Sequence, residues 1–272
     1  MTLIPKKGLA AQREKELEEK LEAYRSSLSE EQLDAMVEKT KALEAYQEAG
    51  EDPKALECIP MLKRSDIKRE AAKIINEELT VDDSLFLYHD VCTNGIGYVD
   101  LMFKTDSIAP EQIPYLGLLK SVLGYVDTEN YTYGELFNEI NANTGGINCG
   151  VEVFDRVDST EEFQAMFSVR GKALYTKMDF LFKMIGEILN SSKLEDTKRL
   201  YEIVASVKSR AQVNLTGAGH STAVLRAAAY SSPMAAFQDE MAGIGYYQFI
   251  EKLEKDFEQR KEETVEELCK LI

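Results

Sequence analysis

The sequence predicts an α+β protein in which a helical hairpin is followed by an antiparallel sheet of about four strands packed with several helices. The first observation is a run of apolar residues at helical spacing through residues 8–50. The second is a set of short segments between residues 84 and 169 in which apolar and polar residues alternate, the pattern of a strand with one buried face. The third is helical spacing after residue 170, which supplies helices to cover one side of the sheet.

The first element is expected to be an antiparallel pair of helices within residues 8–50. Ser29 and Gln32 have the spacing of a capping box, which marks the start of the second helix. The apolar stripes of the two helices are Leu9, Leu17, Leu21 and Tyr24, and then Leu33, Met36, Val37, Leu43 and Tyr46. Charged residues are dense between these positions, so we interpret the hairpin as a solvated, coiled-coil-like arm and not as a ligand site.

The hairpin is followed by a segment in which prolines interrupt helical structure. Asp52-Pro53 and Cys58-Ile59-Pro60 break the second helix, and Ser65 is expected to cap a shorter one. The apolar residues assigned to that shorter helix are Ile67, Ala71, Ile74 and Ile75. We therefore predict a connector at residues 1–80 and an α+β domain at residues 81–272. The opening MTLIPKKGL looks like the end of a strand followed by a linker, which indicates a chain that begins inside a larger protein.

The predicted sheet begins with two strands around a turn signal. Before Thr93-Asn94-Gly95, Leu85 and Leu87 alternate with Phe86 and Tyr88, and after it residues 98–103 divide between two faces of a strand. Because Asn and Gly both tolerate positive φ, the two strands are expected to be antiparallel neighbours in a hairpin. The same alternation predicts two further strands at residues 147–153 and 163–169.

The predicted helices of the second domain lie between and after these strands. Pro110 suits the start of a helix with Ile113, Leu116 and Leu119 on one face. A second helix uses Leu136, Ile140 and Phe137, and ends at Gly145-Gly146. Further helices are expected at residues 174–189, 194–207, 224–230 and from Ser232-Pro233, with an interruption at residues 214–220, a tight turn at residues 243–247 and a last charged helix at residues 258–272.

Composition excludes several classes of function. The chain has 48 acidic and 32 basic residues and a net charge of −16, whereas a nucleic-acid binder needs clustered Lys and Arg. The charge serves solubility, or alternatively attracts cationic peptides. No apolar run approaches the ~20 residues of a membrane span, and no apolar signal-peptide core is present. Four widely spaced cysteines, Cys58, Cys92, Cys149 and Cys269, indicate reduced thiols and hence a cytoplasmic location.

No motif in the chain carries recognisable catalytic chemistry. The two histidines, His89 and His220, lack the neighbouring ligands that a catalytic zinc ion needs. Residues 216–219, Thr-Gly-Ala-Gly, resemble a phosphate loop, but no strand precedes them and Thr222 stands where a dinucleotide fingerprint has its third glycine. The carboxylate pairs Glu30-Glu31, Glu77-Glu78 and Glu161-Glu162 lie in solvated contexts. We predict no catalytic, cofactor-binding or metal-binding residue in this chain.

A set of longer segments resembles a known family. They are Pro5-x-x-Gly8-Leu9, LECIPMLKRSDI, FLYHDVCTNGIGYVDLMF, IPYLGLLKSVLGYVDTENYTYGEL and NTGGINCGVEVF. Together they resemble the middle region of presequence-protease-like zinc metallopeptidases, a branch of the pitrilysin and insulinase superfamily, over essentially the whole chain. The resemblance implies a clamshell of two related halves joined by a helical hairpin and closing around a peptide chamber. This chain would supply the hairpin and the first domain of the non-catalytic half, an insulinase-like half-domain.

The resemblance also implies counterparts for the residues of the catalytic half. Its inverted zinc motif H-x-x-E-H would correspond to residues 114–119, with Tyr115, Leu118 and Leu119 in place of the two histidines and the catalytic glutamate. The segment Gly145-Gly146-Ile147-Asn148-Cys149 resembles the edge strand that binds substrate backbone in the catalytic half, and here it is expected to be structural. Zinc is expected in the parent enzyme and not in this chain.

The resemblance therefore implies the non-catalytic segment of a zinc-dependent peptidase that degrades short unfolded peptides. This segment would hinge the two halves through residues 8–50 and wall the peptide chamber with its sheet domain. It is expected to be inactive alone and to pair with the catalytic half. The alternatives are a stand-alone helical-hairpin and α+β interaction module, or a natural non-catalytic subunit of a two-chain peptidase. The sequence leaves open the peptide specificity, the oligomeric state, whether Met1 is the natural start, and whether the chamber wall contacts substrate directly.

Overall fold

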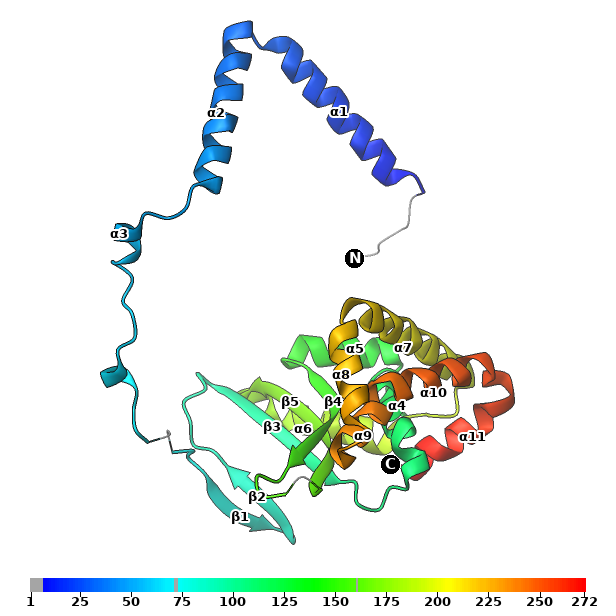
Figure 1. Cartoon of the computed structure of the whole chain (residues 1–272). Coiled ribbons are helices and arrows are strands. Elements are labelled where there is room, and N and C mark those ends of the chain that lie inside the picture. The colour runs from blue at the N-terminus through cyan, green and yellow to red at the C-terminus, as the bar shows by residue number, and fades with distance from the viewer. Residues whose placement is uncertain (1–6, 71–72, 160) are drawn as a thin grey trace. The chain divides into compact units, whose positions relative to one another are not determined.

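The computed structural model describes residues 7–70, 73–159 and 161–272. It divides the chain into two compact units, Met1–Ile74 and Ile75–Ile272. Helices and antiparallel strands together make it an α+β protein, as predicted (Figure 1). The assignment of residues 1–80 to a connector and 81–272 to a separate domain stays a prediction.

The first unit contains the two predicted helices of the hairpin, α1 (Leu9–Ser27) and α2 (Glu30–Glu48), followed by the short α3 (Pro53–Leu56). The predicted capping box is present, because the Gln32 backbone N–H donates to Ser29 Oγ and the Ser29 backbone N–H donates to Gln32 Oε1. Neither α1 nor α2 contains a buried residue. The apolar stripe of each helix is therefore exposed.

The shorter helix predicted after Ser65 does not form in the described residues. Residues 64–70 instead contain a 3₁₀ turn, η1 (Arg64–Asp66), in which the Asp66 carboxylate accepts from the Lys63 backbone N–H. Ile67, Ile74 and Ile75 are outside any helix and exposed, and Ala71 lies outside the described residues. The prediction failed because a short helix depends on packing of its apolar face, and Ile67, Ile74 and Ile75 are all exposed.

The first strand pairing also differs from the prediction. β2 (Ser84–Tyr88) pairs with β1 (Glu77–Val81) in a two-stranded antiparallel sheet, and not with the strand after Asn94-Gly95. The connecting residues Asp82 and Asp83 both have positive φ, as a two-residue hairpin turn requires. Two turn signals therefore compete for β2, and the shorter connection costs less loop entropy. Asn94 and Gly95 do have positive φ, but their turn leads into a different sheet.

The main sheet has three strands in the order β3-β5-β4, so the predicted sheet of about four strands is replaced by two smaller sheets. The strands are β3 (Ile96–Lys104), β4 (Ile147–Asp155) and β5 (Phe163–Leu174), all antiparallel. β5 is central, and Phe167, Val169 and Ala173 on one of its faces are buried in the core. β4 and β3 are the two edges.

Helices pack against one face of this sheet and against one another. In chain order they are η2 (Pro110–Gln112), α4 (Ile113–Val122), α5 (Tyr133–Asn143), η3 (Tyr175–Lys177), α6 (Met178–Ser191), α7 (Thr197–Gly217), α8 (Gly219–Ala228), α9 (Pro233–Ala242), α10 (Ile244–Lys255) and α11 (Phe257–Lys270). The predicted interruption at residues 214–220 shrinks to Ala218, which separates α7 from α8. The predicted turn at residues 243–247 shrinks to Gly243, because α10 begins at Ile244.

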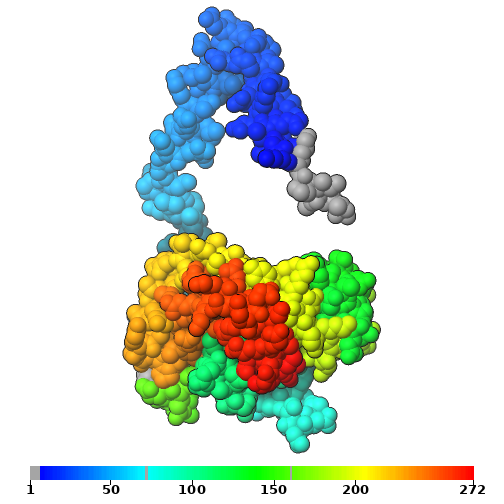
Figure 2. All heavy atoms as spheres, turned by 90° about the vertical axis from the view of Figure 1, so that its right-hand side faces the viewer, coloured from blue at the N-terminus to red at the C-terminus, as the bar shows by residue number. Residues whose placement is uncertain are grey.

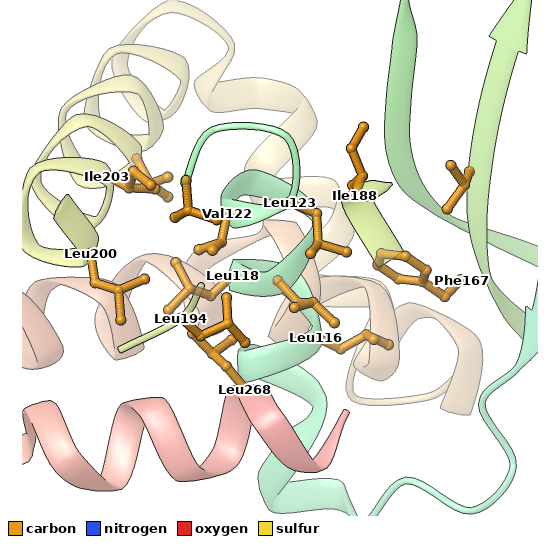
Figure 3. Packing of buried hydrophobic residues seen from close by; sticks show 14 of the residues in the cluster. Leu116, Leu118, Val122, Leu123, Phe167, Ile188, Leu194, Leu200, Ile203 and Leu268 are labelled. Atoms are coloured by element: carbon orange, nitrogen blue, oxygen red, sulfur yellow. The ribbon is translucent and has the colours of Figure 1, made fainter. Parts of the chain in front are cut away.

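α4 lies at the centre of the core. It packs against β4, α7, α9, α10 and α11. Figure 3 shows the side chains of Leu116, Leu118, Val122 and Leu123 among residues from the surrounding elements, such as Phe167, Leu200 and Leu268. Seven of the ten residues of α4 are buried, which explains why the sequence of this segment is so rich in leucine.

The close packing of α4 predicts that Gly117→Ala destabilises the protein. A Cβ atom on Gly117 would lie 2.8 Å from Tyr246 Cε2 and 2.9 Å from the backbone carbonyl oxygen of Met241. Overpacking of this kind lowers the free energy of unfolding by about 1–3 kcal/mol. Urea denaturation followed by circular dichroism measures the change.

Gly134→Ala in α5 is the matched control, because a Cβ atom there meets nothing within 4 Å. It is expected to leave the free energy of unfolding unchanged or raise it by up to about 1 kcal/mol, as alanine is the better helix former. Equal effects of the two substitutions would contradict the packing described for Gly117.

Candidate functional site

Residues 114–119, which the resemblance pairs with the zinc motif, form the first part of α4. Pro114, Tyr115, Leu118 and Leu119 are all buried, and Leu118 has no exposed surface. The segment begins with a proline in the first helical turn and continues with leucines, and these residues are part of the core. The side chains at the three positions of interest therefore face the protein interior and offer no open position for a substrate.

Tyr115 is the one polar side chain among these three positions, and it contacts α11. Its hydroxyl donates to Glu263 Oε1 at 3.1 Å and accepts from the Arg260 guanidinium at 2.9 Å. Next to it, Gln112 Nε2 donates to Glu267 Oε2 at 2.9 Å. The Tyr115 ring also packs edge-on against Phe249 of α10, with centroids 4.9 Å apart. These contacts join α4 to the C-terminal helices.

The electrostatics of this cluster are those of a structural contact. Burial raises the pKa of Tyr115 to about 12, which the Arg260 charge opposes and the Glu263 charge reinforces. The hydrogen bond from Arg260 lowers the pKa of Glu263 below its ordinary value. At neutral pH Tyr115 is therefore neutral and Glu263 is charged. Neither group titrates near pH 7, so the pair is not suited to acid–base catalysis.

The residues at this position do not fit a zinc ion. Catalytic zinc takes nitrogen, sulfur or carboxylate ligands from about three side chains, and Leu118 and Leu119 can supply none. Across the described ranges, no three His, Cys, Asp or Glu side chains are grouped so that they could hold a metal ion. α4 contributes apolar side chains to the core and not a set of metal ligands.

The Gly145-Gly146 segment leads into β4, which is an edge strand of the main sheet. Gly146 has a φ of 109°, a conformation that side-chain-bearing residues rarely adopt, and Gly145 lies directly against the Lys172 side chain. Backbone conformation therefore explains the glycine at position 146, and close packing explains the glycine at position 145. Cys149 is half-buried against the core, where burial raises the pKa of its thiol to about 12, so it is not a reactive thiolate.

The face of the main sheet opposite the helices carries charged and apolar residues. We call it the open sheet face: Tyr98, Asp100, Met102, Glu152, Phe154, Met166 and Arg170. Arg170 bridges the three strands, with its guanidinium 2.7 Å from Asp100 and 3.2 Å from Glu152. Because these side chains are partly exposed, each ion pair stabilises the fold by no more than about 1 kcal/mol. Sequence reasoning missed this bridge, which only the strand register brings together.

A second contact that the sequence did not reveal is buried among α8, α9 and α10. The Asp239 carboxylate, only 1% exposed, accepts from the Arg226 guanidinium at 2.6 Å. It also accepts from the backbone N–H groups of Ile244 and Gly245 at the start of α10. The carboxylate is thus fully used in capping a helix and pairing a cation.

The two histidines, the Thr216–Gly219 segment and the three carboxylate pairs do not form a common site. His89 is exposed and its Nδ1 is 2.7 Å from the carbonyl oxygen of Ile75, while His220 is exposed in the first turn of α8. The Thr216–Gly219 segment is not a phosphate loop, since it spans the end of α7 and the start of α8. The three carboxylate pairs are exposed. Within the described parts of the chain, no helix is both long and apolar enough to cross a membrane.

Comparison with known proteins places these features in a family context. A family model described as peptidase M-16C associated matches residues 3–253. Protein HypA of Clostridium perfringens is 34% identical over the whole chain, which covers 28% of that protein. Presequence protease 1, chloroplastic/mitochondrial, of Arabidopsis thaliana is 30% identical over 89% of the chain, and the mitochondrial presequence protease of Yarrowia lipolytica 28% over 86%. The chain spans between 22% and 28% of the length of these relatives.

Proposed function

Because the chain belongs to the peptidase M-16C associated family, we propose that it is the non-catalytic segment of a zinc-dependent peptidase that degrades short unfolded peptides. The observation that carries the proposal is the length comparison. Presequence proteases match nearly the whole chain, yet the chain covers less than a third of them. The remaining part would include the catalytic half, and the zinc ion would be held there, since α4 here supplies only core residues.

Within such a peptidase, residues 8–50 act as the hinge between the two halves. Two long helices with dense surface charge, the second of them capped by Ser29, are stiff enough to span a gap, and a hinge needs stiff arms with short flexible joints. The apolar stripes of α1 and α2 are exposed in this chain, which is the state expected of surfaces that meet another part of the protein.

The open sheet face acts as a wall of the peptide chamber. It is broad and lies opposite the helices, and Met102, Met166 and Phe154 offer adaptable apolar contacts to peptides of varied sequence. The charges of Arg170, Asp100 and Glu152 are paired with one another, so they select little by charge. Selection would then rest on the size of the chamber.

One observation favours a second candidate function, a protein-interaction module. The exposed apolar residues of α1 and α2 would equally serve a helical partner on a separate chain. A natural non-catalytic subunit that pairs with a separate catalytic chain would use the same surfaces. The predicted cytoplasmic location remains part of the proposal; all four cysteines are free thiols.

Zinc content and peptide cleavage test the proposal together. The isolated chain, dialysed against a weak chelator, is expected to retain far less than one zinc per chain and to cleave no quenched-fluorescent peptide. The longer polypeptide that contains it, or the isolated chain mixed with a catalytic half, is expected to hold about one zinc and cleave the peptide. A variant of the catalytic half without its motif glutamate controls for contaminating peptidases.

Two results would refute the proposal. About one tightly held zinc in the isolated chain would mean that residues described here as core or surface form a ligand cluster. Full peptide cleavage by a catalytic half that lacks this chain would mean that the chain takes no part in the reaction, and would favour the interaction module.

A further inference from the structure

The end of α7 and the whole of α8 form a surface that differs from the rest of the chain in charge. Residues 211–232 contain a single residue from the set Asp, Glu, Lys and Arg, namely Arg226, in a chain of which 29% is charged. The stretch is instead rich in alanine, glycine, serine and threonine. A solvated helical surface in an acidic protein would be expected to carry charges throughout.

This charge-poor stretch is exposed or half-buried along its length. None of residues 211–230 is buried, whereas the first half of α7 contributes Leu200, Ile203, Val204 and Val207 to the core. The exposed fractions are 68% for Val213, 69% for Val224 and 82% for Tyr230. In Figure 2 the yellow to gold spheres of α7 and α8 lie at the surface of their unit. Sequence spacing also places Val224 and Ala227 on one face of α8.

The one charge in the stretch is already paired within the unit. The Arg226 guanidinium is bound to the buried Asp239 carboxylate, and its Cζ lies 5.7 Å from the centre of the Tyr230 ring. We call the exposed apolar residues Val213, Val224, Ala227 and Tyr230 the α7–α8 surface. Residues 211–232, which include these four, carry no unpaired charge, and such a composition is found at the core of protein interfaces and not at their rim.

We propose that the α7–α8 surface docks against another folded part of the same longer peptidase, through an uncharged apolar surface on that part. The proposal rests on the proposed function, and on the length comparison behind it: relatives carry more than two thirds of their length outside the matched region. Two parts of one polypeptide that stay in permanent contact need no charged residues to steer their association or to keep the contact surface soluble. This would account for the scarcity of charged residues in 211–232.

The test compares oxidation of Tyr230 by hydroxyl-radical footprinting in the isolated chain and in the longer polypeptide. Docking is expected to slow the oxidation of Tyr230 at least about threefold in the longer polypeptide, because an interface core excludes water. Val224→Glu in the longer polypeptide is expected to restore the fast rate, since it places a charge in the apolar contact. Equal rates in the two unmodified proteins would overturn the proposal.

Val157→Glu is the matched control, because Val157 is fully exposed and lies in the β4–β5 loop, outside the α7–α8 surface. It is expected to change neither the Tyr230 rate nor the melting temperature. In the isolated chain both substitutions should leave the melting temperature within about 1 °C, as exposed sites do. A restored rate with Val157→Glu would count against the proposal.

The oligomeric state of the isolated chain shows whether the α7–α8 surface binds a second copy of this chain or, as proposed, another part of the longer peptidase. Light scattering is expected to show a monomer. A dimer that Val224→Glu dissociates would overturn docking within one polypeptide, and would identify a second copy as the occupant. Neither outcome depends on zinc content or peptide cleavage, so failure of this proposal can be told from failure of the proposed function.

Discussion

Leu118→Glu is expected to leave the Ile75–Ile272 unit unfolded. Leu118 has no exposed surface and lies in α4, the helix around which the core is packed. A carboxylate at this position would be desolvated without a partner, and the loss in free energy of unfolding would exceed about 4 kcal/mol. That is most of the stability of an ordinary domain, which is about 5–15 kcal/mol. Loss of the cooperative thermal transition in calorimetry is the measurement.

Two further variants separate the effect of the new charge at position 118 from the effect of lost side-chain volume and from the effect of a charge at an exposed position. Leu118→Ala removes the same methyl groups without adding charge, and should lower the free energy of unfolding by about 2–5 kcal/mol. Leu85→Glu places the same charge at an exposed position of β2, and should change it by no more than about 0.5 kcal/mol. A cooperatively folded Leu118→Glu variant would show that α4 is not the core helix described here.

The same position decides whether the zinc motif can be restored. Tyr115→His, Leu118→Glu and Leu119→His together recreate the letters H-x-x-E-H. We expect no zinc site from this triple variant, because the three side chains are buried in the core and α4 would have to leave it. A folded triple variant with about one zinc per chain would contradict this expectation.

Asp239→Asn has the second largest expected effect. The Asp239 carboxylate pairs with Arg226 and accepts from two backbone N–H groups of α10, so the amide would leave a cation without its counter-ion. Breaking a buried ion pair costs about 3–5 kcal/mol, and we expect the lower end because water can reach Arg226 from outside. Urea denaturation measures the change, and hydrogen exchange should show early opening of α9 and α10.

Asp158→Asn is the matched control for Asp239→Asn. Asp158 also pairs with an arginine, Arg156, but both side chains are mostly exposed. The urea midpoint should therefore be indistinguishable from that of the unchanged protein. If the two substitutions shifted the midpoint equally, burial of Asp239 would not be the reason for its effect.

Features that depend on near neighbours in the chain were predictable from the sequence. The α+β class, the capping box of Ser29 and Gln32, the end of α5 before Gly145-Gly146 and the apolar character of α4 each follow from a local pattern. The family resemblance belongs to the same group, because it rests on continuous segments.

Only the tertiary structure decided which segments meet. β2 had two turn signals beside it, and the pairing with β1 follows from the cheaper two-residue connection. The helix expected after Ser65 had an apolar pattern, but its isoleucines Ile67, Ile74 and Ile75 are exposed. Arg170 with Asp100, and Arg226 with Asp239, join residues whose proximity depends on strand register and helix packing. Sequence patterns report the local preference of the chain, whereas these contacts form only after distant segments have packed.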